Sequence, residues 1–316
     1  MHSSSSLPAA VVILGPTASG KSALAAAVAR KCGAEIISAD SRQIYRELTI
    51  GAAKPSRETL QEIRHHFIDE KSIGEPFSAG EFASEALLRI QEIHRRGKKA
   101  IVAGGSTLYL EGIISGFSDL PPSDPEIRRK LLLELEQEGR ESLFRRLVAI
   151  DPVQAATLDQ TKTHRLIRSL EIITLTGQTV TALQAAESFN NAPFRTIPIG
   201  IDTARQRLYE AIDKRTDLMI ENGLIEEAEG LYGKFKPLLS EKPCPPLQSV
   251  GYQELFEYFN GTVDLARAVS LIKQHTRNYA KRQMTFFRNR LEPTWIEAPE
   301  KIDEWDSVAD DIAALF

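Results

Sequence analysis

One short motif constrains the fold of this chain more than any other feature. Residues 15–22 read Gly-Pro-Thr-Ala-Ser-Gly-Lys-Ser and match the phosphate-binding pattern G-x-x-x-x-G-K-[ST]. The apolar run from Ala9 to Leu14 predicts a buried strand before the motif, and the alanine-rich run from Ser22 to Lys31 predicts a helix after it. The alternative, an accidental match in a turn, is disfavoured by this strand and helix. The sequence therefore predicts a P-loop that binds a di- or triphosphate.

The chemistry of phosphate binding assigns roles within the motif. Loop amides and the helix N-terminus attract the anion, Lys21 adds a mobile positive charge, and Ser22 is the expected ligand of Mg²⁺, the one cofactor that we expect. The candidate diphosphate-binding residues are Gly15, Pro16, Thr17, Ala18, Ser19, Gly20, Lys21 and Ser22.

Strands alternate with helices through the first third of the chain. Further strands are expected at Glu35 to Ala39 and Ala100 to Ala103, with helical spacing from Glu81 to Arg96 between them. This alternation favours a parallel sheet that is covered on both faces. From Glu126 to about Glu187 all periodic runs are helical, and Phe194 to Ile201 then returns to strand-like composition, with Pro198 favouring an edge or end position.

We therefore predict an α/β fold: a P-loop NTPase-like parallel sheet flanked by helices, with an all-helical insertion domain. The expected boundaries are 1–117 for the first part of the core, 118–190 for the insertion and 191–316 for the rest of the core with basic C-terminal helices. No run approaches the roughly 18 apolar residues of a membrane span. Two cysteines, Cys32 and Cys244, make no disulfide framework, and we expect a cytoplasmic protein without membrane attachment.

Asp40 follows the second predicted strand, at the sheet edge where open α/β folds bind ligands. Three roles are open for it: holding Mg²⁺, acting as a general base beside the phosphate, or ending a strand as a solvated carboxylate. The residues that follow, Ser41 to Tyr45, combine a hydroxyl, a cation, an amide and an aromatic ring. This mixture suits contact with a nucleobase or sugar better than metal binding alone.

The charge is unevenly distributed. The net charge is −4, which excludes a uniformly basic RNA-binding protein. Between Leu265 and Leu291, however, there are seven cations and no acid, and Lys273, Arg277 and Lys281 are spaced to share one helix face. This stripe indicates a polyanion site, with a solvated helix face as the alternative. Further basic candidates lie in the insertion: His164, Arg165 and Arg168, and the run that begins at Arg128.

An ordered series of motifs resembles the bacterial tRNA dimethylallyltransferases from about residue 11 to residue 297. Besides the P-loop, the series contains Ile37-Ser-Ala-Asp-Ser-Arg-Gln-Ile-Tyr45, Ile50-Gly-Ala-Ala-Lys-Pro55, His66-Phe-Ile-Asp69, Gly104-Gly-Ser-Thr-Leu-Tyr109, Leu120-Pro121, Asp124-Pro-Glu-Ile-Arg128, His164-Arg-Leu-Ile-Arg168, Val250-Gly-Tyr252 and the run from Thr276 to Arg288.

The resemblance implies a monomeric enzyme that transfers a dimethylallyl group from dimethylallyl diphosphate to N6 of adenosine 37. The acceptor is the anticodon stem-loop of tRNAs that read codons beginning with U. Asp40 would be the general base, and Thr17 and Arg215 would contact the diphosphate. Without the resemblance, the neighbours of Arg215 would favour a surface ion-pair network. The implied tRNA contacts are Asp40, Ser41, Arg42, Gln43, Ser106, Arg128, His164, Arg165, Leu166, Ile167, Arg168, Lys273, Arg277 and Lys281.

Three other functions use the same motifs. A small-molecule kinase would need the P-loop but not the basic helix, and a nucleotide-switched RNA-binding protein would need both but catalyse no transfer. A prenyltransferase acting on free adenine nucleotides would share the chemistry but need neither the insertion nor the basic stripe. One departure from the family pattern is Ser106, where threonine is usual, which keeps the hydroxyl and loses the methyl group.

Overall fold

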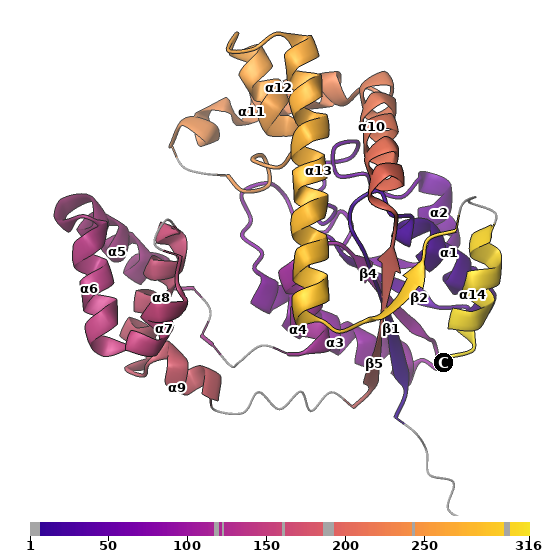
Figure 1. Cartoon of the computed structure of the whole chain (residues 1–316), viewed down its shortest axis with the longest axis horizontal. Helices are drawn as coiled ribbons and strands as arrows, with labels where there is room; N and C mark the ends of the chain where they lie inside the picture. The colour runs from indigo at the N-terminus through magenta and orange to yellow at the C-terminus, as the bar shows by residue number, and fades with distance from the viewer. Residues whose placement is uncertain are drawn as a thin grey trace, which may run out of the picture. The chain divides into compact units, whose positions relative to one another are not determined.

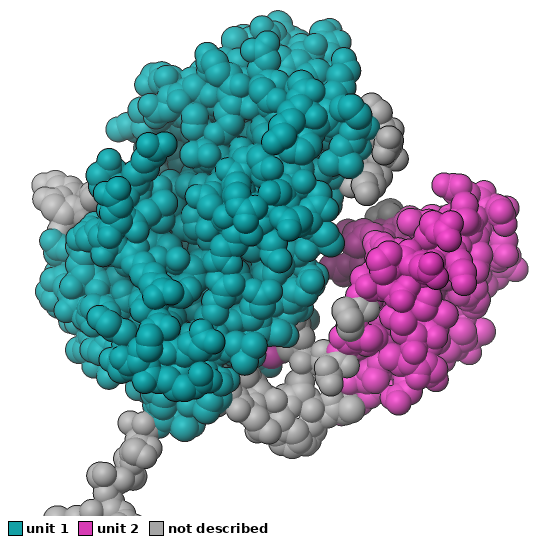
Figure 2. All heavy atoms as spheres, turned by 180° about the vertical axis from the view of Figure 1, so that it is seen from behind, with its two compact units in different colours: residues 1–115, 192–316 teal, residues 116–191 magenta. Residues whose placement is uncertain are grey.

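A computed structural model of the chain describes residues 7–116, 120–121, 123–159, 162–185, 193–241, 244–299 and 304–316. The chain divides into two compact units, residues 1–115 together with 192–316, and residues 116–191 (Figure 2). The division lies two residues before the first boundary expected from the sequence and one residue after the second.

The larger unit is built on a six-stranded, wholly parallel sheet in the order β3-β2-β4-β1-β5-β6 (Figure 1). All residues of the central strands β1 and β2 are buried, as expected for strands with helices on both faces. The strands are β1 Ala9–Leu14, β2 Glu35–Ala39, β3 His65–His66, β4 Ala100–Gly104, β5 Arg195–Asp202 and β6 Thr294–Glu297.

Helices cover both faces of this sheet, which confirms the predicted fold class. Val11 and Ile13 of β1 belong to one core together with α1 and α14, whereas the alternate residues Val12 and Leu14 belong to a second core with α3, α4, α12 and α13. The helices of the unit are α1 Lys21–Cys32, α2 Arg57–Glu62, α3 Ala79–Arg95, α4 Thr107–Ile114, α10 Arg205–Glu221, α11 Leu224–Glu241, α12 Tyr252–Phe259, α13 Leu265–Arg290 and α14 Trp305–Ala313.

The carboxyl ends of three neighbouring strands bring the predicted site together. Gly104 at the end of β4 pairs with Leu14 of β1 and Ala39 of β2. A Cβ at Gly104 would lie 2.1 Å from the carbonyl oxygen of Ala39, so the close approach of these strands requires glycine. The P-loop follows β1, Asp40 follows β2 and Gly105 follows β4.

Proline is accommodated in β5 as the sequence predicted. Pro198 lies opposite Val12 of β1, and β6 pairs with β5 only from Ile199 onward. The proline therefore occupies a stretch of β5 that has a paired neighbour on one side only, the kind of position in which a sheet tolerates proline.

The smaller unit, residues 116–191, consists of helices throughout its described residues, as predicted. Asp124 caps the first of them by accepting hydrogen bonds from the amides of Glu126 at 2.8 Å and Ile127 at 2.9 Å. The unit has its own apolar core, formed by Leu131, Leu143, Leu147, Ala155, Leu166, Ile167 and Leu170. Its helices are α5 Pro125–Glu138, α6 Arg140–Ile150, α7 Pro152–Thr157, α8 Thr163–Thr176 and α9 Val180–Ala185.

Candidate active site

The P-loop connects β1 to α1. Gly20 immediately precedes α1 with a φ of 86°, in the left-handed region that favours glycine. Trp305 of α14 packs against it so closely that a Cβ at position 20 would lie 2.7 Å from the indole ring. Inside the loop, the hydroxyl of Ser19 is buried and has no hydrogen-bond partner among the described residues. Such a group is a donor available to an anion in the loop.

Lys21 carries a perturbed charge at the first position of α1. Its Nζ donates a hydrogen bond to the carbonyl oxygen of Pro16 at 3.1 Å. Burial and the nearby Arg215 guanidinium lower the pKa of Lys21 to about 8, although the Asp40 carboxylate acts in the opposite direction. Lys21 is thus mainly protonated at neutral pH, and a bound diphosphate would compensate the two neighbouring cations.

Arg215 reaches the P-loop from α10. Its Nη2 donates a hydrogen bond to Thr17 Oγ1 at 2.6 Å, and its Nε is buried without a partner among the described residues. Burial lowers the pKa of this arginine, with Asp40 opposing the shift. The surface ion-pair network that its helical neighbours suggested is therefore wrong. The structure instead places Arg215 beside Thr17, the other residue that the family resemblance assigns to the diphosphate.

Asp40 lies directly after β2, at the start of a tightly bonded turn. Its Oδ1 accepts a hydrogen bond from the Arg42 amide at 2.8 Å, which fixes the carboxylate relative to the turn. The amide of Ser41, the residue after Asp40, donates to Ser106 Oγ at 2.9 Å. The Ser106 amide in turn donates to the carbonyl oxygen of Ala39 at 3.1 Å. Ser106 thus stabilises the turn that contains Asp40. It does not line the cavity of about 320 Å³ into which Asp40 faces.

A cavity of about 320 Å³ joins these elements. The predicted residues that line it are Thr17, Lys21, Ser22, Asp40, Ser41, Arg42, Gln43 and Arg215. The phosphate loop, the candidate base and the Thr17–Arg215 pair therefore face one space. Sequence reasoning gave Arg282 a place among the cations of the basic helix, but it assigned no role to several other lining residues, namely Gly51, Ala52, Ala53, Gln248, Ser249, Val250, Thr276 and Tyr279. All of these except Gln248 and Ser249 belong to motifs of the family series, which was the available signal.

Tyr279 and Arg282 form part of the wall that α13 contributes. The Arg282 guanidinium lies 5.9 Å from the centre of the Tyr279 ring. Although Tyr279 is about one-third exposed, desolvation beside the cavity and the negative charge of Asp40 raise the pKa of its hydroxyl, which stays protonated and can donate a hydrogen bond.

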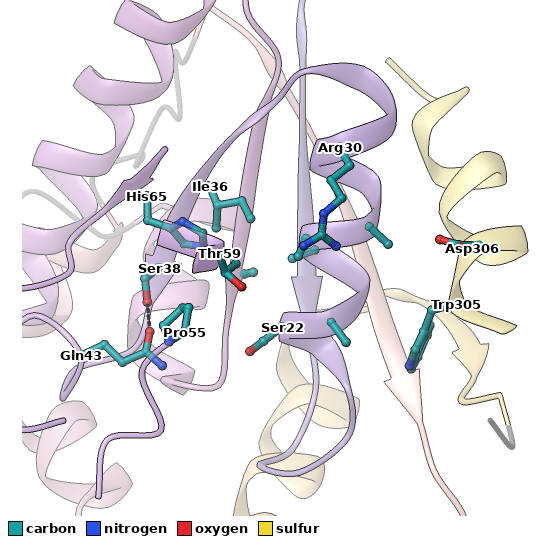
Figure 3. Close-up of a pocket in the computed structure, with 15 residues that line it drawn as sticks. Ser22, Arg30, Ile36, Ser38, Gln43, Pro55, Thr59, His65, Trp305 and Asp306 are labelled. Atoms are coloured by element: carbon teal, nitrogen blue, oxygen red, sulfur yellow. Dashed lines mark hydrogen bonds between the residues drawn. The ribbon is translucent and has the colours of Figure 1, made fainter. Parts of the chain in front are cut away.

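A second cavity, of about 460 Å³, borders α1, and it shares four lining residues with the first: Ser22, Ser38, Gln43 and Ala103 (Figure 3). Ser38 Oγ donates to Gln43 Oε1 at 2.8 Å, and this bond lies where the cavities adjoin. Gln43 Nε2 donates to the carbonyl oxygens of Ala52 and Ala53. The side-chain amide of Gln43 thus holds the wall of the site together.

The basic stripe on α13 is largely neutralised. Lys273 pairs with Asp217 and Arg277 with Asp213, both at 2.5 Å and both through acids of α10. Arg288 and Arg290 also form ion pairs, at 3.0 Å, with Asp202 and Glu111. Lys273 and Arg277 of the predicted stripe are therefore paired within the protein, which weakens their attraction for a polyanion, and contact of the stripe with tRNA stays a prediction. Among the described residues, the cations of this helix outside ion pairs are Arg267, Lys281 and Arg282.

The candidate RNA contacts in the smaller unit separate into two groups. His164 and Arg165 are exposed at the start of α8, but Leu166 and Ile167 are each only 1% exposed in the core of the unit. Contact between their side chains and RNA is therefore excluded in this fold. Arg128 and Arg168 pair with the buried carboxylate of Glu171, at 3.4 and 3.1 Å, and so contribute to the internal structure.

The residues present suit Mg²⁺ bound together with a diphosphate. The Ser22 side chain lines the cavity beside Lys21, where its hydroxyl can supply one oxygen ligand. No cluster of three or more His, Cys, Asp or Glu side chains within the described part of the chain would bind a metal by itself. A phosphate-bound Mg²⁺ needs no such cluster, because it takes most of its ligands from phosphate oxygens and water.

Comparisons with known proteins place this geometry in a family. The model of the family "IPP transferase" matches residues 43–290. The chain is 61% identical to the tRNA dimethylallyltransferase of Pelodictyon phaeoclathratiforme, over 96% of both chains. It is also 61% identical to the enzyme of the same name from Chlorobium limicola, over 91% of this chain and 90% of the relative.

Solved structures agree with the sequence relatives. The tRNA isopentenylpyrophosphate transferase of Bacillus halodurans superposes with a TM-score of 0.69 at 35% identity, covering 96% of this chain and 95% of the other. A eukaryotic dimethylallyltransferase acting on tRNA gives a TM-score of 0.83 at 27% identity, covering 97% of this chain and 77% of the other. Among the described residues, no helix is long and apolar enough to span a membrane. On its sequence, its fold and the geometry of its site, this chain belongs to the IPP transferase family.

Proposed function

We propose that the chain transfers a dimethylallyl group from dimethylallyl diphosphate to N6 of adenosine 37 in tRNAs that read codons beginning with U. The products are N6-(dimethylallyl)adenosine and pyrophosphate. The observation that carries the proposal is the cavity of about 320 Å³ in which a carboxylate, Asp40, faces the same space as a P-loop and the Thr17–Arg215 pair. The names of the relatives support the same reaction.

The P-loop is the proposed site of the diphosphate. The Ser19 hydroxyl and the guanidinium of Arg215 are buried donors with unused capacity, and Lys21 adds a positive charge beside them. These groups stabilise the negative charge that develops on the leaving pyrophosphate. Mg²⁺, held by Ser22 and the phosphate oxygens, would supply further charge neutralisation there.

Asp40 is the proposed general base. In the transfer, a bond forms between N6 of the adenine and C1 of the dimethylallyl group, and the bond between C1 and the diphosphate oxygen breaks. The amine loses a proton, which Asp40 accepts. The hydrogen bond from the Arg42 amide holds the carboxylate at the cavity wall, where it can receive this proton.

The adenine must leave the stack of the anticodon loop to enter this cavity, at a cost of a few kcal/mol that is lower in a single-stranded loop. We propose that Lys281 and Arg282 contact phosphates of that loop, since both lie outside ion pairs and Arg282 also lines the cavity. On the smaller unit, the exposed side chains of His164 and Arg165 are the proposed contacts.

We propose, from the family resemblance, that the chain acts as a monomer. The thiols of Cys32 and Cys244 are unpaired, which supports a reducing, cytoplasmic location.

The decisive experiment uses labelled dimethylallyl diphosphate, Mg²⁺ and an anticodon stem-loop with adenosine at position 37. We expect label in this RNA and none in the same loop with guanosine 37 or in free adenine nucleotides. Label in free nucleotide alone would indicate the smaller acceptor. Consumption of ATP without RNA, with a phosphorylated metabolite as product, would indicate a kinase.

The matched variants are Asp40→Asn and Asp202→Asn. The first keeps an oxygen that can accept from the Arg42 amide but removes the base, so transfer should fall at least about 100-fold while donor affinity is retained. Asp202 ends the strand β5 of the same sheet outside the cavity lining, and its variant should transfer at a rate near that of the wild type. A wild-type rate for Asp40→Asn would eliminate Asp40 as the base.

A further inference from the structure

A buried glutamine on α13 bonds to two of the loops that build the site. Gln283 is only 2% exposed. Its Oε1 accepts a hydrogen bond from the Thr17 amide at 2.9 Å, and its Nε2 donates to the carbonyl oxygen of Gly105 at 2.8 Å. The side chain therefore bridges the P-loop and the loop that follows β4, and both ends of its amide are used.

The contact with Thr17 belongs to a larger docking of the P-loop tip. Ala18, with a φ of 64°, packs against Leu208 and Ile212 of α10 and Ala280 of α13. Next to Ala18, the amide of Thr17 donates to Gln283, and the hydroxyl of the same threonine accepts from Arg215. Helices from the last third of the chain thus restrain the conformation of the loop tip.

The contact with Gly105 depends on the absence of a side chain at that position. A Cβ at Gly105 would lie 2.5 Å from Gln283 Nε2 and 3.6 Å from Lys21 Cε. The glycine lets the amide group of Gln283 enter between the two loops. A side chain at position 105 would expel it.

Building on the function proposed above, we propose that Gln283 is a positioning residue for transfer. By holding the Thr17 amide and Gly105, it orients the Thr17 hydroxyl and the Arg215 guanidinium toward the diphosphate. Gln283 does not itself contact substrate, because its two amide ends are engaged within the protein. Replacement of Gln283 should therefore impair the binding and reaction of dimethylallyl diphosphate and leave the binding of RNA unchanged.

Kinetics of Gln283→Met test this role, with Gln274→Met, at an exposed position of the same helix, as the matched control. Methionine has a similar length but neither accepts from Thr17 nor donates to Gly105. We expect the kcat/KM for dimethylallyl diphosphate to fall about 10- to 100-fold, the range for a misplaced catalytic group. The KM for the stem-loop should stay within about twofold of the wild type, which a positioning role on the donor side requires.

Gly105→Ala provides a second route to the same displacement, should the methionine variant fold poorly. Circular dichroism and thermal unfolding monitor folding in each variant. A rise in the KM for the stem-loop with unchanged donor kinetics would overturn the proposal in favour of direct RNA contact. Unchanged kinetics for a folded Gln283→Met would overturn it as well.

A double-mutant cycle with Thr17→Ala separates positioning from general stability. If Gln283 acts through Thr17, Gln283→Met should lower the logarithm of kcat/KM for dimethylallyl diphosphate less than half as much in the Thr17→Ala background as in the wild type. Full additivity would contradict the proposed path. Absence of transfer by the wild-type chain would refute the proposed function itself. Calorimetric titration with inorganic pyrophosphate would then test Gln283 independently, and we expect Gln283→Met to bind pyrophosphate at least fivefold more weakly.

Discussion

The pKa of Lys21 makes a quantitative prediction about the binding of the donor. Burial and the adjacent Arg215 lower this pKa to about 8 in the free protein. Bound diphosphate favours the charged ammonium, so it raises the pKa of Lys21 in the complex. The affinity for dimethylallyl diphosphate should therefore be fully developed below pH 8 and fall as the pH rises above it.

The magnitude follows from the fraction of Lys21 that is protonated. A group with a pKa of about 8 is mostly charged at pH 7 and about one-tenth charged at pH 9, so the affinity should fall about tenfold, or about 1.4 kcal/mol. The last ionisation of the phosphate group has a pKa of about 6, which leaves the charge of the donor nearly constant in this range.

Isothermal titration calorimetry between pH 6.5 and 9.5, at constant Mg²⁺ and ionic strength, measures this fall. Lys21→Arg is the control, because a guanidinium keeps its charge throughout the range, and its affinity should not show the fall. Arg215→Met should move the fall to higher pH, since removal of a neighbouring cation raises the pKa of Lys21. A wild-type affinity that varies by less than twofold from pH 7 to pH 9 would refute the reasoning. An identical fall in Lys21→Arg would refute it too.

Three further predictions concern the sheet, the smaller unit and the RNA surface. Gly104→Ala should lower the free energy of unfolding by about 3 kcal/mol in urea titrations, because its Cβ would lie 2.1 Å from the backbone oxygen of Ala39, which the sheet holds in place. A loss below about 1 kcal/mol would contradict the strand spacing. Leu166→Ala, at a position 1% exposed, should cost about 2–5 kcal/mol of stability in the same assay, and a loss of RNA affinity with full stability would show that the residue faces RNA. Joint replacement of Lys281 and Arg282 by alanine should reduce the slope of log affinity against log salt by about 1.4 in binding assays with the stem-loop, whereas an unchanged slope would remove both from the interface.

Local sequence patterns were sufficient for the elements that are long or wholly apolar. The strand around Val11 is an uninterrupted apolar run before the P-loop, and the strand around Ile37 is a short, largely apolar run that ends before an acid. The position of both could therefore be predicted closely. The two-residue β3 and the four-residue β6 have no periodicity to detect. Helix α12 starts at Tyr252, directly after Gly251 with its φ of 106°, and α11 continues through Pro237, although proline usually ends a helix.

The candidate site was predictable where its residues are neighbours in sequence. The P-loop and the Asp40 turn each form one contiguous motif with its own chemistry. Gln283, in contrast, bonds to a residue 266 positions away, and nothing in local spacing indicates such a contact. The same holds for the burial of Arg215, since a helical arginine among charged neighbours has the pattern of an exposed one. Long-range packing, which decides both, is not encoded in any short pattern.

The ion pairs between α10 and α13 reduce the positive charge that α13 can present to RNA. Asp213 and Asp217 neutralise Arg277 and Lys273, so much of the positive charge counted along α13 produces little field at a distance. Lys281 and Arg282 keep their charge, and Arg282 belongs to the cavity wall. The attraction is therefore concentrated where a single nucleotide would enter, not spread along the helix. Under the proposed function, this distribution favours contact with phosphates beside the nucleotide that enters the cavity over contact with a polyanion along the whole helix.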